Sequence, residues 1–346
     1  MRTLIFRLIR LIAALFIVLI LLAVSWGATG VSEKSFRSKI NEELRGLRVS
    51  LAQGIRDPGE LERVLQVKEK ELEHFYGLDK PWHRRSVEKT SGILHFDFGE
   101  AKNLRTAEGS SKVKDIILER MPRTLLLMLT SFVIIAVFGI LIGLWLATKP
   151  YSKADKITSG FSSISAALPA WLLGIPLIIV FGVVLGWLPT GGMYSVPPPE
   201  GGLARFADLL KHAILPVTSL VLVSLGPYLY EIRSMTLKIA QEDFVTYARA
   251  MGFSELRIRL RHILRPAAPP IAPGLLLGLA GSFSGAIITE MVFNWPGMGS
   301  LCREAFLGTP DEGLIVSLTF IFILLYVAAV FALEILYLWL DPRISY

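Results

Sequence analysis

Few residues in this sequence have the types and spacing that catalysis or metal binding requires. The 346-residue chain contains one cysteine, Cys302, so an internal disulfide is excluded, and no Cys/His cluster has metal-ligand spacing. The phosphate-binding pattern Gly-x-x-x-x-Gly-Lys-Ser/Thr is absent, so we expect neither an ATP site of the usual kind nor enzyme activity. Two acids, Glu290 and Glu334, lie in apolar stretches, and an acid within a membrane is a candidate functional group.

The segment 234–270 has the pattern of a short helix with an apolar strip. The apolar residues recur at spacings of three and four and would share one face: Phe244, Tyr247, Ala248 and Met251. Asp243 favours a helix start, because acids stabilise the positive end of the helix dipole, and Gly252 suits a helix stop. Such a strip indicates a partner surface, burial against the chain's own core, or a position in the lipid interface.

The elements that position these residues are apolar helices. The chain is 53% hydrophobic and 19% charged, with a mean hydropathy of +0.54, whereas soluble domains are roughly 25% charged. A helix of roughly 20 residues crosses the hydrocarbon core of a bilayer. Six stretches are long and apolar enough to do so: 4–26, 122–148, 157–186, 213–233, 271–291 and 313–340.

We therefore expect an all-α polytopic membrane protein with six transmembrane helices and a mixed extracytoplasmic insertion between the first two. The expected parts are a first helix at 1–26, an extracytoplasmic segment at 27–121, and a core domain at 122–346 with a cytoplasmic loop at 234–270. Lys and Arg concentrate in the short loops on one side, which places both termini and the 234–270 loop in the cytoplasm. The net charge of +7 follows this distribution and does not indicate nucleic acid.

Several local features carry further expectations. The first span, with its basic start and small residues at 23–28, also has the pattern of a cleaved signal peptide. Gly139 and Gly143 suit close helix packing. Glu231 and Arg233 would extend to the membrane interface. Four tryptophans fit interfacial belts: Trp171, Trp187, Trp295 and Trp339.

Motifs spread over residues 75–346 resemble a known family in order and spacing. They read Gly77-Leu-Asp-Lys-Pro-Trp82, Leu185-Gly-Trp-Leu-Pro-Thr-Gly-Gly192, Asp243-Phe-Val-Thr-Tyr-Ala-Arg-Ala-Met-Gly252, Arg261-His-Ile-Leu-Arg-Pro-Ala267, Glu290-Met-Val-Phe-Asn-Trp-Pro-Gly-Met-Gly299 and Asp341-Pro-Arg343. The sequence resembles the permease subunits of ABC importers, in the peptide and nickel branch, and most of all the B-type dipeptide and oligopeptide permeases. It departs from that family at Met251, where a basic residue is usual, and in the long, charged stretch 31–75.

The resemblance implies a function for the 234–270 loop. In that family this segment is the coupling helix, which docks on a separate ATPase subunit. The residues that match the motif would couple the chain to the ATPase: Asp243, Phe244, Tyr247, Ala248, Arg249, Ala250, Met251, Gly252, Arg261, His262 and Arg265. The family also tends to have acids at the positions of Glu290 and Glu334, so we expect these two to make hydrogen bonds between helices rather than to couple protons.

The resemblance also implies partners and a location. The complex would contain a second homologous permease, two ABC ATPases that bind ATP and Mg, and an extracytoplasmic solute-binding protein, in the lipid of a bacterial inner membrane. This chain itself would bind no cofactor. Peptides are the expected substrate, with nickel chelates, sugars and antibiotic-like peptides as alternatives. A proton-coupled secondary transporter and a receptor or scaffold with an outer domain are the other classes considered. The first predicts more buried acids and inverted repeats, and the second requires no coupling helix.

Overall fold

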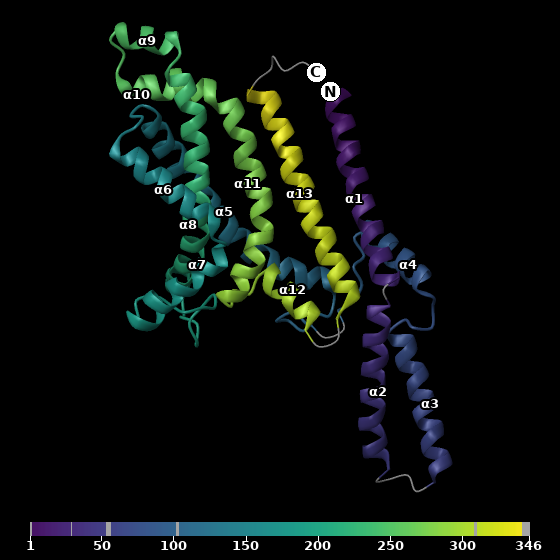
Figure 1. Ribbon diagram of the computed structural model, residues 1–346. Coiled ribbons are helices and arrows are strands. Elements are labelled where there is room, and N and C mark those ends of the chain that lie inside the picture. Colours follow the sequence, from purple (N-terminus) through teal and green to yellow (C-terminus); the bar gives the residue numbers. More distant parts are fainter. Residues whose placement is uncertain (1, 29, 53–56, 102–103, 308–309, 341–346) are drawn as a thin grey trace. The chain divides into compact units, whose positions relative to one another are not determined.

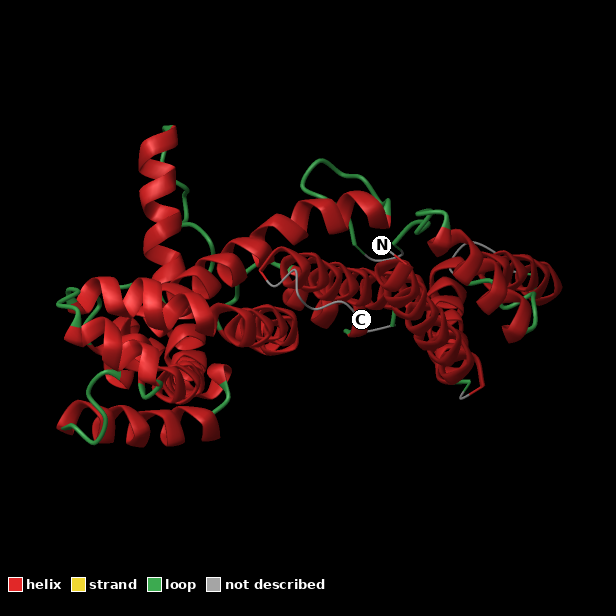
Figure 2. Ribbon diagram, turned by 90° about the horizontal axis from the view of Figure 1, so that it is seen from above, coloured by secondary structure: helices red, strands yellow, loops and turns green. Residues whose placement is uncertain are grey.

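The structure is almost entirely helical. The computed structural model describes most of the chain, with the backbone alone at some positions: residues 2–28, 30–52, 57–101, 104–307 and 310–340. In these ranges no strand occurs (Figure 2), and one isolated β-bridge joins Glu100 to Lys112. The helical fold class is thus confirmed.

The chain divides into two compact units. The first contains residues 1–8, 120–301 and 325–346, and the second contains 9–119 and 302–324. Four helices contribute residues to both units: α1 (Arg2–Ala28), α5 (Val113–Ala147), α12 (Met298–Phe306) and α13 (Glu312–Leu340).

The first unit is arranged around the long helix α8 (Figure 1). Its other elements follow in chain order: α6 (Lys153–Ala167), α7 (Ala170–Leu177), the π-helical η1 (Ile178–Val184), α8 (Gly202–Ala240), α9 (Asp243–Ala250), the one-turn α10 (Glu255–Arg257), the π-helical η2 (Ile258–Leu264) and α11 (Arg265–Val292). Helices α6, α7 and α11 all pack against α8. The central helix therefore connects the elements on which the candidate site rests.

Several helices have the length and composition of membrane spans. Among the described residues, α5, α8 and the 313–332 part of α13 are long and apolar enough to cross a bilayer, and α1 contains a shorter apolar stretch at 9–21. Helix α6 and the α7–η1 helix pass the same test only as a pair. The chain is thus a membrane protein with several apolar helices.

The stretch 157–186, expected as one span, is two helices bent by 102°. The break lies at Leu168, whose φ of −106° and ψ of 132° are extended rather than helical. Proline disfavours the helical conformation of the residue before it and has no N–H to donate, so Pro169 ends α6 and begins α7. The expected span is therefore not one continuous helix.

The glycine pair of α5 lies against α8 as expected. A Cβ atom built on Gly143 would lie 2.8 Å from Cγ2 of Ile232, and one built on Gly139 would collide with the ring of Tyr228. Ile232 is completely buried and packs in a cluster with Tyr228 and α11 residues, including Ile271. The two glycines allow the backbones of α5 and α8 to approach closely.

The second unit contains a helical hairpin in the stretch where we expected a mixed insertion. Its helices α2 (Val31–Leu51) and α3 (Pro58–Phe75) lie side by side, and α4 (Trp82–Leu94) follows (Figure 1). Asp57 caps α3 by accepting a hydrogen bond from the N–H of Gly59 at 3.0 Å. Phe36 and Tyr76 stack in a small core, with ring centroids 5.1 Å apart.

Candidate functional site in the 241–265 segment

Helix α9 has clearly marked ends. The chain turns after α8 through Gln241 and Glu242, and α9 begins at Asp243. At the other end Gly252 has a φ of +79°, and its N–H donates to the carbonyl of Arg249 at 2.9 Å. The next N–H, of Phe253, donates to the carbonyl of Ala248 at 3.3 Å. These two bonds form a Schellman motif, in which glycine is favoured because of its positive φ. The predicted stop at Gly252 is confirmed.

Helix α9 has one buried face and one exposed face. Val245 and Ala248 are 0% and 4% exposed, and they pack with Leu144 of α5 and with Ile258 and Ile263 of η2. On the exposed face three large apolar side chains point to solvent, with exposed fractions of 46%, 73% and 65%: Phe244, Tyr247 and Met251. We call these three residues the apolar strip.

The position of Ala248 corrects the expected face. We placed Ala248 among the exposed apolar residues, but its side chain lies in the chain's own core. Val245 is the second residue of that inner face, and the sequence carried no separate expectation for it. Its spacing of three residues from Ala248 was the available signal, because residues i and i+3 share a helix face.

The chain that returns from α9 is fixed by aromatic and charged contacts. Phe253 stacks on the ring of His262, with centroids 5.6 Å apart and planes at 16°. The guanidinium of Arg257 lies 4.5 Å from the centroid of Phe253. Arg249 donates from Nε to Glu255 at 3.1 Å. The loop is therefore a compact unit at the end of α8 (Figure 1).

The remaining predicted coupling residues are spread around this loop. Asp243, which opens α9, Arg249 and Ala250 are exposed on α9, Arg261 is exposed in η2, and Arg265 is exposed where α11 begins. His262 is half-buried through its stack on Phe253. The structure thus brings Arg249 and His262 into contacts within the loop, while Arg261 and Arg265 remain at its surface.

An ion pair connects the loop end of α8 to the start of α6. Arg233 donates from Nε and Nη2 to the two carboxylate oxygens of Asp155, at 2.8 and 2.7 Å. The Arg233 and Asp155 side chains are 17% and 6% exposed. This bidentate pair holds the guanidinium inside the unit, and the extension of Arg233 to the membrane interface stays a prediction. The two residues are 78 positions apart, so no local pattern in the sequence indicated the pair.

Glu290 is the centre of a second polar cluster. Its side chain is fully buried, and Oε1 accepts from the hydroxyl of Thr124 at 2.6 Å while Oε2 accepts from the N–H of Gly299 at 2.6 Å. The N–H of Met298 donates in turn to the Thr124 hydroxyl at 2.7 Å. Glu290 therefore bonds α11 to α5 and to the start of α12, as expected of a residue with a structural role. The side chain of Glu334 lies outside the described residues.

Trp295 is part of the same region and is not at a membrane interface. It is completely buried, and its Nε1 donates to the carbonyl of Arg123 at 3.0 Å. Arg123 donates from Nη1 to the carbonyl of Pro296 at 3.3 Å. The interfacial expectation was wrong for Trp295, since its indole N–H has a protein partner. Trp187 is 63% exposed, and the side chain of Trp339 lies outside the described residues.

Comparison with known proteins decides the family. Residues 139–346, more than half of the chain, match the family model described as "Binding-protein-dependent transport system inner membrane component". The chain belongs to this family. The match includes α8, the whole 241–265 loop and α11.

Relatives of this inner membrane component are permeases of peptide transport systems. The oligopeptide transport system permease protein AppB of Bacillus subtilis is 31% identical over 84% of this chain and 90% of its own length. The di/tripeptide transport system permease protein DppB of Pseudomonas aeruginosa is 30% identical over 79% and 84%. The glutathione transport system permease protein GsiC of Salmonella choleraesuis is 30% identical over 78% and 82%.

A solved structure has the same fold. A chain of the MetNI methionine ABC transporter, in an inward-facing conformation, superposes with a TM-score of 0.53 at 15% identity. The match covers 65% of this permease chain and 96% of the MetNI chain.

Proposed function

We propose that this permease is one membrane-spanning half of an ATP-driven importer of di- and oligopeptides, coupled to its ATPase through α9. The observation that carries the proposal is the apolar strip of Phe244, Tyr247 and Met251, which is exposed although α9 has its own buried face. Large apolar groups in water are unfavourable, and aromatic side chains dominate the binding energy of protein interfaces. The strip is therefore the surface that an ATPase subunit would cover.

The inner face of α9 makes the loop suitable for transmitting movement. Val245 and Ala248 pack on α5 and η2, and the ion pair of Asp155 and Arg233 connects α6 to α8 next to the loop. A displacement of α9 by the closing ATPases would thus move α5, α6 and α8 together. Membrane transport by such movement requires two states whose populations ligands shift.

The peptide specificity follows from the relatives. The proteins that are about 30% identical over most of the chain have oligopeptide, di/tripeptide and glutathione transport in their names. The substrates in these names are all short peptides. We propose the same class of substrate for this chain.

The proposal also includes the partners and the topology. The complex contains a second, related permease, two ATPases that bind and hydrolyse ATP with Mg, and an external solute-binding protein. The chain crosses a bacterial inner membrane six times, with both termini and the 241–265 loop in the cytoplasm and the α2–α3 hairpin outside. The chain binds no cofactor of its own.

Proton coupling is the weaker alternative for this chain. Both carboxylate oxygens of Glu290 accept short hydrogen bonds, from Thr124 and from Gly299. An acid that carries protons needs access to water and hydrogen-bond partners that change. The short bonds of Glu290 instead favour one fixed set of partners.

The test is a charge placed on the apolar strip. Tyr247→Asp puts a carboxylate at the most exposed position of the strip. We expect the recovery of ATPase subunits with the purified permease to fall about tenfold or more, because aromatic residues at interface centres contribute about 2 kcal/mol or more. ATP-driven peptide uptake should fall with it.

The matched control is Thr246→Asp. Thr246 is exposed on the same helix, next to Tyr247 but outside the strip. The Thr246→Asp permease should retain both co-purification with the ATPase subunits and ATP-driven peptide uptake. Normal assembly of the Tyr247→Asp protein, or equal loss in the two variants, would contradict docking through the strip.

A further inference from the structure

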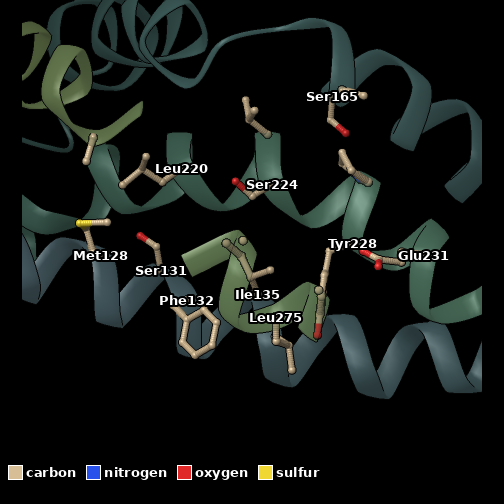
Figure 3. Close-up of a pocket in the computed structure, with 16 residues that line it drawn as sticks. Met128, Ser131, Phe132, Ile135, Ser165, Leu220, Ser224, Tyr228, Glu231 and Leu275 are labelled. Atoms are coloured by element: carbon tan, nitrogen blue, oxygen red, sulfur yellow. The ribbon is translucent and has the colours of Figure 1, made fainter. Parts of the chain in front are cut away.

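A cavity of about 410 Å³ lies in the first unit between α5, α6, α8 and α11. Its walls are mostly apolar, with residues such as Met128, Phe132 and Leu220 (Figure 3). Of the 16 described residues that line it, Glu231 is the one with an acidic or basic side chain. The cavity is thus an apolar space with a single acidic group.

Tyr228 has an unused polar group in this cavity. The residue is only 8% exposed, and its hydroxyl has no hydrogen-bond partner within the described part of the chain. Two serines of the lining differ, because Ser131 and Ser165 donate to carbonyls of their own helices, at 2.7 and 3.2 Å. Buried hydroxyls are nearly always paired, so an unpaired one indicates a partner that is absent from the isolated chain.

Glu231 lies next to Tyr228 on the same face of α8. The two residues are three positions apart, and Figure 3 shows the Glu231 carboxylate beside the backbone end of the Tyr228 side chain, whose hydroxyl points toward Leu275. The nearest cation along the helix, Arg233, is held by Asp155 through two hydrogen bonds. No hydrogen bond or ion pair to Glu231 occurs among the side chains that the structure describes. We expected Glu231 to extend to the membrane interface, and the structure shows that it lines this cavity.

The wall opposite Glu231 is shaped around its carboxylate. A Cβ atom built on Gly274 of α11 would lie 2.7 Å from Oε1 of Glu231. A larger residue at position 274 would displace the carboxylate, so glycine leaves space for it. A carboxylate in a membrane segment is unfavourable unless a cation or hydrogen-bond donors accompany it.

We propose that this cavity binds the ammonium group of the transported substrate, namely the free amino terminus of a short peptide. Glu231 forms the ion pair with the ammonium, the Tyr228 hydroxyl bonds a polar group further along the peptide, and the apolar walls contact the first side chain of the peptide. This inference depends on the proposed function, because it assigns the recognition of a peptide end to the permease itself.

The test measures occupancy of the cavity in the assembled transporter. A cysteine is placed in the lining by Ser224→Cys in a Cys302→Ser background, and its reaction with a maleimide is followed in the complete complex. Trialanine should slow the reaction about tenfold at saturation, and N-acetyl-trialanine, which has no ammonium, should not. Equal protection by both peptides, or by neither, would overturn the proposal.

Variants of the acid give an independent readout. Glu231→Gln should abolish protection by trialanine and lower its uptake about tenfold, Glu231→Asp should restore most of both, and Tyr228→Phe should lower uptake about threefold. Glu69→Gln, which removes an exposed carboxylate from α3, is the matched control. Co-purification of the ATPases should be normal in all four proteins. Normal trialanine uptake by the Glu231→Gln protein, together with normal protection of its cysteine at position 224 by trialanine, would overturn the proposal.

These results are separable from failure of the proposed function. A complex that assembles with its ATPases but imports another class of solute and no peptide would contradict the peptide assignment. A complex that imports trialanine equally well with Glu231 and with Gln at that position would contradict only the ammonium site.

Discussion

Two small side chains of α9, Val245 and Ala248, decide which surface of the loop is available to a partner. They pack on Leu144, Ile258 and Ile263, so the opposite face has to carry Phe244 and Tyr247 into solvent. A charged residue at position 248 would thus destabilise the permease itself, whether or not a partner is bound. The distinction is accessible to experiment, because Ala250, two residues further on, is exposed.

We predict that Ala248→Asp destabilises the isolated permease and that Ala250→Asp does not. A carboxylate buried without a partner costs about 3 kcal/mol or more, whereas surface substitutions usually change stability by about 0.5 kcal/mol or less. Thermal unfolding of the two purified variants in detergent, without ATPase, would measure the difference. Similar melting temperatures for both would show that Ala248 is not packed as described.

At the scale of elements, close contact between α5 and α8 depends on the absence of side chains. Gly143 faces Cγ2 of the buried Ile232, and the next atoms along are Cβ of Ile232 and the backbone N of Arg233. This contact holds α5 against α8, the helix that carries Arg233 of the ion pair with Asp155. The packing of α5 on α8 therefore helps to set the position of Arg233, near the end of α8 from which the 241–265 loop begins.

We predict that Gly143→Ala lowers the stability of the permease and that Gly160→Ala does not. The added methyl group of the first variant overpacks a filled site, which costs about 1–3 kcal/mol. A Cβ atom on Gly160, in α6, meets nothing within 4 Å, so alanine there should be neutral or stabilising by about 0.5–1 kcal/mol through its helix propensity. Unfolding in denaturant would compare the two variants, and a stable Gly143→Ala protein would contradict the close packing.

At the scale of the whole molecule, the proposed topology places the α2–α3 hairpin and the α9 loop on opposite sides of the membrane. The hairpin carries exposed positions such as Val67, which is 60% exposed, and the loop carries Thr246. The sequence offers a simple background for labelling, because Cys302 is its one cysteine.

We predict opposite labelling of single cysteines at these two positions in intact cells. In a Cys302→Ser background, Val67→Cys should react with a membrane-impermeant maleimide from outside, and Thr246→Cys should react only after permeabilisation. The expectation rests on the excess of Lys and Arg in the short loops of one side. Reaction of both cysteines from outside would contradict the six-span topology with a cytoplasmic amino terminus.

The sequence by itself determined the local features of this protein. Long apolar stretches predicted a membrane protein, because roughly 20 apolar residues in a helix span a bilayer. The spacing of Phe244, Tyr247 and Met251 predicted α9, and Gly252 predicted its end, since a positive φ at that position favours glycine. All of these depend on residues that lie in one continuous stretch of the sequence.

Only the tertiary structure decided which groups meet across the chain. Arg233 finds Asp155 78 residues away, and Glu290 finds Thr124 166 residues away. The same holds for Ala248, which lies in a core built from α5 and η2, and for Glu231, which lines a cavity between four helices. Helical periodicity specifies that a face exists, but the packing of distant helices determines what covers it.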